Sequence, residues 1–420
     1  MNRILYTALL YVLIIFTPFK LLWRARKQPE YLQHWCERYG FYEEQPQKPI
    51  IWLHCVSVGE TRAAAPLVHA LMLQHPKHRI LLTHATPTGR ATAKLLFSDS
   101  VQSVYLPYDL PFAVHHFLAH FKPTIGVLME TELWFNLIAA CKQKKIPLLL
   151  VNARLSEKSA RGYAKLGLLA KQGLADLTAI AAQTEDDASR LTMLGANNVT
   201  VVGNLKFDVN PPKEALLLGE KLRHLIGKYR PVFLAASTRD GEEALILDTL
   251  LKVNVPNLLT VIVPRHPQRF DEVEALLKAH CLAYEKRSDL NSDALTISEK
   301  TQYLLGNSMG ELFTYYAICD VAFIGGSLLP FGGQNLIEAC AVGKPSLVGP
   351  HTFNFTQVAN LAIEFGATKR VKDVAGLAAT LNTLLVDQNQ QQQMAVAALQ
   401  FSQINQGATE RVARLIEQFI

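Results

Sequence analysis

The sequence predicts an α/β protein with two units, each a parallel β-sheet that carries helices on both faces. Short apolar runs alternate along the chain with segments of helical periodicity, which is the pattern of strands joined by crossover helices. Apolar residues make up 49% and charged residues 19% of the 420 residues, so the chain can bury a large core and is not disordered. A turn-rich segment near the middle separates the two units.

The predicted strands fall into two groups on either side of that segment. The first group lies at residues 50–55, 79–83, 124–129, 147–151, 177–181 and 199–202. The second group lies at residues 232–236, 258–263, 302–305, 321–324 and 346–348. Helical periodicity fills intervals such as residues 61–74, 186–194, 270–280 and 334–342. The turn-rich sequence DVNPP begins at Asp208, so we place the second unit at residues 209–420.

An apolar segment precedes the first unit. Residues 4–19 carry no charge and would rise about 24 Å as a helix, short of the ~30 Å hydrocarbon core of a bilayer. No small-residue cleavage site follows, and the basic residues of segment 20–27 favour a cytoplasmic location for the rest of the chain. The sequence therefore predicts an uncleaved membrane-anchor helix within residues 1–27, which either spans the bilayer or lies in its interface. A buried core helix is the alternative.

The charge balance favours an anionic partner. Lys and Arg number 42 and Asp and Glu 36, which gives a net charge of +6, but no basic run with interleaved aromatic residues indicates nucleic acid. The six cysteines form no C-x-x-C pair, which fits a reducing compartment. Neither D-x-D nor H-E-x-x-H occurs, so no metal site is predicted.

Three loops after strands of the second group are candidate ligand sites. The sequence GGS at residues 325–327 is followed by a second glycine pair and then a helix, a pattern that favours phosphate binding, although the glycines could serve only tight turns. Arg265 and His266 end another strand, where ligands bind in open α/β sheets. Residues 306–310 (GNSMG) match the nucleophile elbow of hydrolases with Ser308 as nucleophile, but a helix cap is the simpler interpretation.

Acidic residues follow two strands of the first group. Glu60 stands after a glycine turn and is either a general base or a first-turn helix residue favoured by the dipole. Glu130 and Glu132 are costly to bury without partners and are otherwise solvated. Lys206, beside the boundary, could face an anionic leaving group. Three basic residues could pair with the two acids: Arg62, Arg154 and Lys206.

Several short strings, weak singly but specific in their order, together resemble one family. The chain resembles the 3-deoxy-D-manno-octulosonic acid (Kdo) transferases of Gram-negative lipopolysaccharide synthesis over nearly its whole length, N-terminal segment included. The strings are SVGETRAA at 57–64, LMETELW at 128–134, NARLS at 152–156, GNLKFD at 203–208, VPRHP at 263–267, GGS at 325–327 and NLIEA at 335–339.

This resemblance implies a GT-B glycosyltransferase with two Rossmann-like domains and an interdomain cleft. Residues 28–208 would bind the acceptor and residues 209–420 the donor. The implied reaction is inverting transfer of Kdo from CMP-Kdo to a lipid A precursor (lipid IVA) at the cytoplasmic face of the inner membrane, without cofactor. Glu60 would be the proton acceptor, and Glu130 and Lys206 would stabilise the transition state. The residues expected to bind CMP are Arg265, His266, Met309, Gly310, Glu311, Gly326, Ser327, Asn335, Leu336, Ile337 and Glu338.

Three other functions remain open on the sequence alone. One is a related GT-B enzyme, such as a nucleotide-sugar epimerase or a hexosaminyl transferase with a diphosphate donor. The second is a membrane-anchored binding protein without catalysis, and the third is a serine hydrolase that uses Ser308. The fold by itself decides among none of them.

Overall fold

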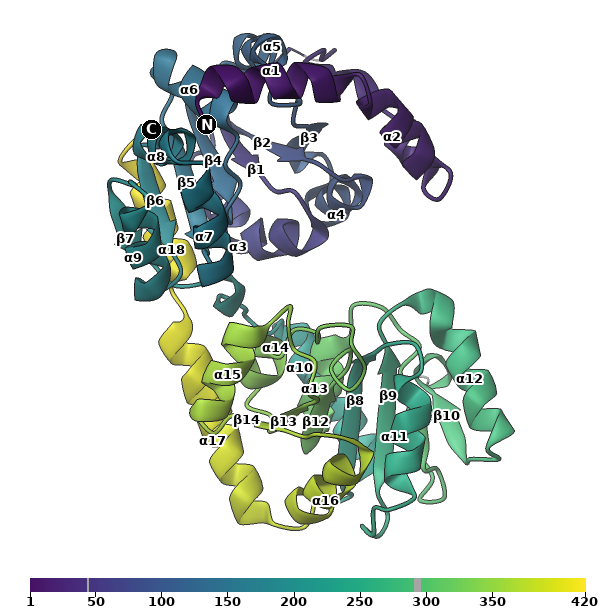
Figure 1. The fold of residues 1–420 in the computed structure, drawn as a ribbon. Coiled ribbons are helices and arrows are strands. Elements are labelled where there is room, and N and C mark those ends of the chain that lie inside the picture. Colours follow the sequence, from purple (N-terminus) through teal and green to yellow (C-terminus); the bar gives the residue numbers. More distant parts are fainter. Residues whose placement is uncertain (44, 291–295) are drawn as a thin grey trace. The chain divides into compact units, whose positions relative to one another are not determined.

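Two seven-stranded sheets organise the chain, and every strand pair in them is parallel (Figure 1). The structure is a computed structural model that describes residues 1–43, 45–290 and 296–420. Contacts divide it into unit 1, Met1–Asp208 with Gln406–Ile420, and unit 2, Val209–Asn405. The predicted pair of parallel α/β sheets is confirmed.

The sheet of unit 1 starts at its centre and winds outward in both directions. Its strands are β1 (Ile50–His54), β2 (Arg79–His84), β3 (Val101–Tyr105), β4 (Ile125–Met129), β5 (Leu148–Ala153), β6 (Ala179–Ala182) and β7 (Val199–Val201). They lie in the order β3-β2-β1-β4-β5-β6-β7. The winding direction therefore reverses between β1 and β4, and open α/β sheets bind ligands outside the carboxyl ends of strands at such a point.

Side chains that alternate along β1 enter two different cores. Ile51 and Leu53 pack with α3 (Val58–Gln74), α4 (Pro87–Phe97) and α18 (Ala408–Glu417). Ile50 and Trp52 pack on the other face with α5 (Pro111–Phe121), α6 (Phe135–Gln143), α8 (Leu168–Asp176) and α9 (Glu185–Met193). A strand buried on both faces reads as a continuous apolar run, which is why β1 could be predicted.

The sheet of unit 2 also starts at its centre and has one reversal, but on one side its strands do not follow in sequence order. Its strands are β8 (Val232–Thr238), β9 (Leu259–Pro264), β10 (Tyr284–Lys286), β11 (Tyr303–Leu305), β12 (Val321–Ile324), β13 (Ser346–Val348) and β14 (Thr368–Arg370). They lie in the order β10-β11-β9-β8-β12-β13-β14, so the direction reverses between β8 and β12.

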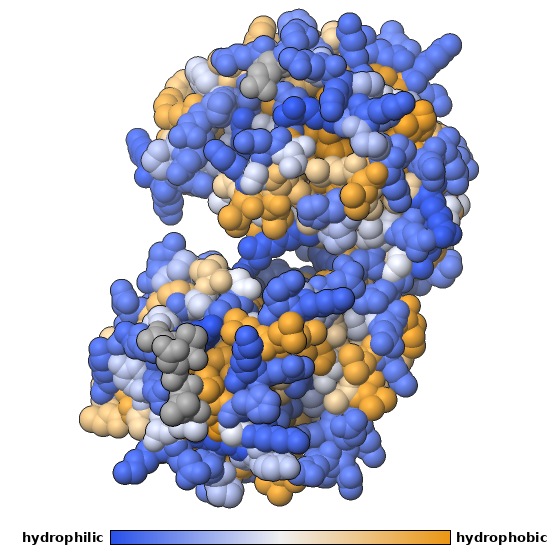
Figure 2. Space-filling view, turned by 180° about the vertical axis from the view of Figure 1, so that it is seen from behind, coloured by the Kyte–Doolittle hydropathy of each residue, from blue (hydrophilic) through white to orange (hydrophobic). Residues whose placement is uncertain are grey.

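Helices also cover the sheet of unit 2. They are α10 (Lys213–Ile226), α11 (Glu242–Leu250), α12 (Phe270–Ala279), α13 (Leu312–Ile318), α14 (Ile337–Ala341), α15 (Thr356–Glu364), α16 (Val374–Leu384) and α17 (Gln388–Asn405). Phe233 and Ala235 of β8 pack with apolar side chains of α11, α12 and α16. Hydrophilic side chains cover most of the face that Figure 2 shows, with apolar ones in scattered patches on both units.

The C-terminal helix corrects the predicted extent of the second unit. The sequence predicts that this unit extends over residues 209–420, but Gln406–Ile420 belongs to unit 1, where α18 packs against α3. Val412 and Ile416 of α18 are fully buried in the core of that unit. Asp208 fixes the start of the helix, because its carboxylate accepts the N–H groups of Gly407 (2.6 Å) and Thr409.

The N-terminal segment consists of two helices instead of the one predicted. They are α1 (Arg3–Ile14) and α2 (Thr17–Ala25), bent by 49°. Pro18 lacks a backbone N–H and its ring excludes a continuous helix, which accounts for the break. In the part of the chain that the structure describes, no one helix has the length and hydropathy to cross a membrane; the bent pair together meets those two criteria.

Helix α1 lies against the body of unit 1. The Tyr6 hydroxyl donates to Asp109 (2.8 Å) and the Thr7 hydroxyl to Asn136 (3.0 Å). Asp109 is buried and also accepts the N–H groups of Asn136 and Leu137 at the start of α6. Burial raises its pKa to about 6.

Candidate active site

Glu60 and Glu130 follow the two strands between which the winding of unit 1 reverses. Glu60 lies in the first turn of α3, directly after β1, and Glu130 directly follows β4. The two strands are neighbours in the sheet, so both acids lie at one edge of it. The structure therefore brings together the two acids that the sequence analysis selected.

Glu60 is held by the residues just before it. Ser57 caps α3: its hydroxyl accepts the Glu60 N–H (3.4 Å) and donates to Glu60 Oε1 (3.0 Å). Glu60 Oε2 accepts the Val56 N–H at 2.7 Å. This is a form of the capping box, so Glu60 is a first-turn helix residue as well as a candidate base.

Burial sets the protonation of Glu60. The residue is 8% exposed. Burial raises its pKa to about 7, the hydrogen bond from Val56 opposes the rise, and the negative charges of Glu130 and Glu132 add to it. A carboxylate with a pKa near the working pH is suited to accept a proton in a reaction.

Glu130 forms an ion pair with Lys206, one of the three basic partners that the sequence predicts. Lys206 Nζ lies 3.0 Å from Glu130 Oε1, and both side chains are about one-third exposed or less. Among the described residues of unit 1, no ion pair joins Arg62 or Arg154 to Glu130 or Glu132. Glu130 has a φ of +57°, a left-handed conformation that is uncommon for a residue with a side chain and that sets its direction at the strand end.

Asn152 links the lysine to the sheet. Lys206 lies in a short 3-10 helix, Leu205–Phe207, whose first N–H, that of Leu205, donates to Asn152 Oδ1 at 3.0 Å. Asn152 belongs to β5, the strand beside β4. The Glu130–Lys206 pair is therefore fixed from two neighbouring strands.

In unit 2, the candidate nucleotide residues follow adjacent strands. Arg265 and His266 follow β9, Met309, Gly310 and Glu311 follow β11, and Gly326 follows β12. Because β11, β9, β8 and β12 are consecutive in the sheet, these loops share one edge. They form the ligand-binding edge expected for this topology.

Arg239 is a site residue that the sequence analysis missed. It follows β8, and its Nη1 donates to His266 Nε2 at 3.0 Å. Its guanidinium lies 4.9 Å from the centre of the Phe331 ring. Burial and the charges of Arg239, Arg265 and Arg269 lower the pKa of His266. The result is a cationic edge with a neutral imidazole, suited to bind an anion.

A buried carboxylate holds the glycine loop. Glu242, fully buried, accepts the N–H groups of Arg239 (2.9 Å), Gly326 (2.5 Å) and Leu328 (2.9 Å). A Cβ on Gly325 would lie 2.5 Å from the Ser237 carbonyl oxygen, so only glycine fits there. The glycines thus serve the close approach of the buried loop to β8.

Three predicted nucleotide residues have side chains inside unit 2. Ser327 is fully buried; its hydroxyl donates to the Ile324 carbonyl and accepts the Gly349 N–H at 2.8 Å. Leu336 and Ile337 are buried as well. We correct the prediction accordingly: close packing excludes these side chains from a ligand, and their backbone groups alone remain candidates.

The segment around Ser308 is a polar network rather than a hydrolase triad. The Ser308 hydroxyl bonds to Glu311 and to the buried Tyr315 hydroxyl, with no histidine among the bonds described for it. Arg287 Nη2 donates to Glu311 at 2.8 Å, a second contact that the sequence analysis missed. Two further residues expected to bind CMP contact each other: Asn335 Nδ2 donates to Glu338 Oε1 at 3.2 Å.

No metal centre is found among residues 1–43, 45–290 and 296–420: no three His, Cys, Asp or Glu side chains there are placed to hold an ion together.

Known proteins resemble the chain along most of its length. The family model described as 3-deoxy-D-manno-octulosonic-acid transferase (kdotransferase) matches residues 33–209, and that of glycosyl transferases group 1 matches residues 282–401. The 3-deoxy-D-manno-octulosonic acid transferase of Bordetella pertussis is 42% identical over 91% of this chain and 90% of its own. The chain belongs to the Kdo transferase family.

A second relative agrees with this assignment, and a solved structure shows the fold. The Kdo transferase of Haemophilus influenzae is 38% identical over 94% of this chain and 93% of its own. A glycosyltransferase of Rickettsia africae, 14% identical, matches with a TM-score of 0.57 over 89% of this chain and 98% of its own, which shows a shared GT-B-like fold. The predicted family is confirmed, and as a Kdo transferase the chain is a glycosyltransferase.

Proposed function

We propose that this chain transfers Kdo from CMP-Kdo to a lipid A precursor (lipid IVA) in lipopolysaccharide core synthesis, with inversion and with Glu60 as general base. Membership of the Kdo transferase family supports the transferred sugar. The observation that carries the mechanism is the position of Glu60: a buried carboxylate with a pKa of about 7 at the ligand-binding edge of unit 1.

In the proposed reaction, Glu60 removes the proton from a glucosamine hydroxyl of the lipid. That oxygen attacks the anomeric carbon of Kdo from the face opposite CMP, and the bond from this carbon to the phosphate oxygen breaks. The departing phosphate gains negative charge. Glu130 keeps Lys206 oriented at 3.0 Å, and this pair would stabilise the transition state, since preorganised charges usually supply the largest single contribution.

We assign the acceptor to residues 28–208 and the donor to residues 209–420, apart from the C-terminal helix. Arg265, His266 and Arg239 would hold the CMP phosphate. The remaining proposed contacts to CMP are Met309, Gly310, Glu311, Gly326, Asn335 and Glu338, with the backbone of Ser327, Leu336 and Ile337.

We further propose that the N-terminal helices attach the enzyme to the cytoplasmic face of the inner membrane. Large apolar side chains on α1 and α2 are exposed, among them Leu9, Phe19 and Trp23. Basic residues lie within and after α2, which suits an anionic lipid surface.

Changing Glu60→Gln tests the base. The variant keeps the size of the side chain and one acceptor oxygen but cannot accept the proton. We expect transfer from CMP-Kdo to the lipid to slow roughly 10²–10⁴-fold while CMP still protects against thermal unfolding. Glu157→Gln, on the surface of α7 (Glu157–Lys165), is the matched control. Unaltered transfer by Glu60→Gln would exclude Glu60 as the base.

The same thermal assay distinguishes the donor class. We expect CMP to raise the unfolding temperature more than UDP does, because a ligand stabilises the state that binds it. Stronger protection by UDP would instead favour an enzyme with a diphosphate donor.

A further inference from the structure

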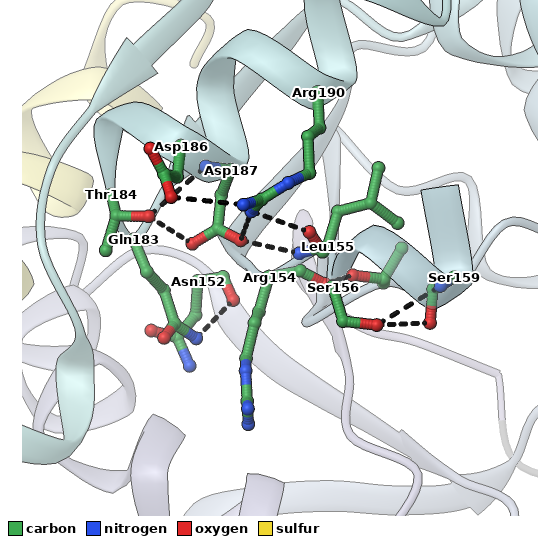
Figure 3. A network of polar contacts seen from close by, with 11 residues as sticks. Asn152, Arg154, Leu155, Ser156, Ser159, Gln183, Thr184, Asp186, Asp187 and Arg190 are labelled. Atoms are coloured by element: carbon green, nitrogen blue, oxygen red, sulfur yellow. Dashed lines mark hydrogen bonds and ion pairs between the residues drawn. The ribbon is translucent and has the colours of Figure 1, made fainter. Parts of the chain in front are cut away.

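The segment NARLS, residues 152–156, has no role in the mechanism above, although it lies at the catalytic edge of unit 1. Arg154 follows β5, which pairs with β4, the strand that carries Glu130. Its side chain is half-buried, and in the described ranges of the chain no hydrogen bond or ion pair is recorded for its guanidinium. Figure 3 shows this side chain extending away from the surrounding polar network.

The backbone on the C-terminal side of Arg154 is fixed by side chains. The Thr131 hydroxyl donates to the Arg154 carbonyl. The Leu155 N–H donates to Asp187 Oδ1 (2.8 Å), and Arg190 Nη1 donates to the Leu155 carbonyl (3.2 Å) (Figure 3). Arg154 is therefore held in place by its main chain while its guanidinium remains available.

The side chains of Asp187 and Arg190 are both used to hold the backbone of Leu155. Asp187 is 2% exposed, and its second oxygen accepts from the Thr184 hydroxyl at 2.6 Å. Arg190 Nη2 pairs with Asp186 at 3.0 Å. Of the two arginines in the network, Arg190 is used for structure and Arg154 is not.

The same segment contacts both catalytic loops. Thr131 lies between Glu130 and Glu132, and Asn152 Oδ1 accepts the N–H of Leu205, the residue before Lys206. These contacts place Arg154 beside the loops that carry Glu130 and Lys206, where a side chain is available to a ligand bound at that edge.

We propose that Arg154 binds an oxyanion of a substrate, either a phosphate of the lipid acceptor or the carboxylate of the transferred sugar acid. This inference rests on the proposed function. Glu60, Glu130 and Glu132 make the edge acidic and would repel an anionic substrate, and Lys206 is already paired with Glu130. A fixed guanidinium with two parallel N–H donors offsets that repulsion and matches the geometry of either oxyanion.

The test compares steady-state transfer by Arg154→Ala, Arg154→Lys and the unaltered enzyme, with each substrate varied in turn. Arg161→Ala is the control, since Arg161 is a surface residue on the neighbouring helix α7 and forms only a 3.8 Å pair with Glu157. We expect Arg154→Ala to raise one KM by about tenfold or more, the usual effect of losing a charged hydrogen bond, and Arg154→Lys to recover part of it.

The substrate whose KM rises identifies the anion that Arg154 binds. A raised acceptor KM, with lost preference for the phosphorylated over the dephosphorylated acceptor, assigns the phosphate; a raised donor KM assigns the carboxylate. Kinetic constants within about twofold of the control, or a large drop in unfolding temperature with unchanged KM, would overturn the inference. Failure of the unaltered enzyme to transfer Kdo would contradict the proposed function instead.

Discussion

The two units share a central first strand and a reversal of direction beside it, but they place different side chains at the edge of the sheet. In each, the first strand lies at the centre of the sheet and is followed by a helix whose first turn contains a carboxylate: Glu60 after β1 and Glu242 after β8. Glu242 is fully buried and accepts three backbone N–H groups, whereas Glu60 accepts one backbone N–H and one hydroxyl. The number of backbone donors distinguishes the acid that supports a loop from the acid proposed as the base.

The charges at the two edges also differ in sign. In unit 1, the negative charges of Glu130 and Glu132 help raise the pKa of Glu60. In unit 2, the positive charges of three arginines help lower the pKa of His266. An acidic edge is suited to proton transfer and a basic edge to anion binding, which are the two halves of the proposed transfer reaction.

The contrast between the two acids is tested most directly with two separate variants, Glu242→Gln and Glu60→Gln. An amide leaves at least one of the three N–H donors without its acceptor, so we expect Glu242→Gln to lower the free energy of unfolding by roughly 2–3 kcal/mol. Glu60→Gln should reduce transfer far more than stability. Chemical denaturation followed by far-ultraviolet circular dichroism measures the first effect, because all four tryptophans lie in unit 1 and would not report the unfolding of unit 2.

Glu220→Gln, on the exposed face of α10, is the control for that measurement. If Glu242→Gln unfolds like the control while abolishing transfer, Glu242 has a chemical role and the contrast between the two acids is wrong.

The next prediction concerns pH. Glu60 acts as a base only when ionised, so transfer should fall about tenfold for each pH unit below its pKa of about 7. The raised pKa has the opposite consequence for stability: the folded state binds this proton more tightly, so the stabilisation from protonation is present at low pH and is lost as pH rises through 7. Transfer rates and unfolding temperatures from about pH 5 to pH 9 measure both trends.

Glu60→Gln supplies the matched comparison for the pH series. The variant should lose both the acid limb of the rate profile and this contribution to the pH dependence of stability. An acid limb that persists in the variant would assign the titration to another group.

A smaller effect is expected from Arg239→Ala in unit 2. It removes the donor to His266 and one charge of the cationic edge, so we expect CMP affinity to fall about tenfold and the pKa of His266 to move back toward its ordinary value. Calorimetry with CMP at two pH values measures both changes. Lys228→Ala, a surface lysine that contacts Tyr229, is the control; equal affinities for the two variants would remove Arg239 from the anion site.

The sequence predicts buried parts of this fold well and edges poorly. The strands that were not predicted, β3, β10 and β14, are all edge strands. The strands β10 and β14 are short and contain charged residues, because an edge strand pairs on one side only and need not be continuously apolar. The return of α18 depends on Asp208 contacting Gly407, a pairing far apart in sequence that no local pattern reveals.

The candidate site shows the same division. Glu60, Glu130 and Arg265 could be selected because each follows a recognisable apolar strand. Arg239 was missed because β8 was expected to end at residue 236, whereas it continues to Thr238 and places Arg239 directly at its end. Lys206 pairs with Glu130 at 3.0 Å, whereas Arg62 and Arg154 were equally possible partners. The spacing of residues along the sequence does not determine this distance in three dimensions.

The smallest predicted effect concerns a feature of unit 1 alone, the docking of α1. Tyr6→Phe removes the hydroxyl that donates to buried Asp109, which should weaken the docking by about 1 kcal/mol and speed hydrogen exchange in α1 roughly fivefold. Tyr11→Phe is the matched control, since Tyr11 lies on the same helix and is 45% exposed. Exchange measured by mass spectrometry in detergent and in anionic vesicles gives the comparison. A faster exchange for Tyr6→Phe in both media means that α1 stays on the body of unit 1 when the enzyme meets lipid. Equal exchange for both variants in vesicles alone means that lipid replaces the Asp109 contact.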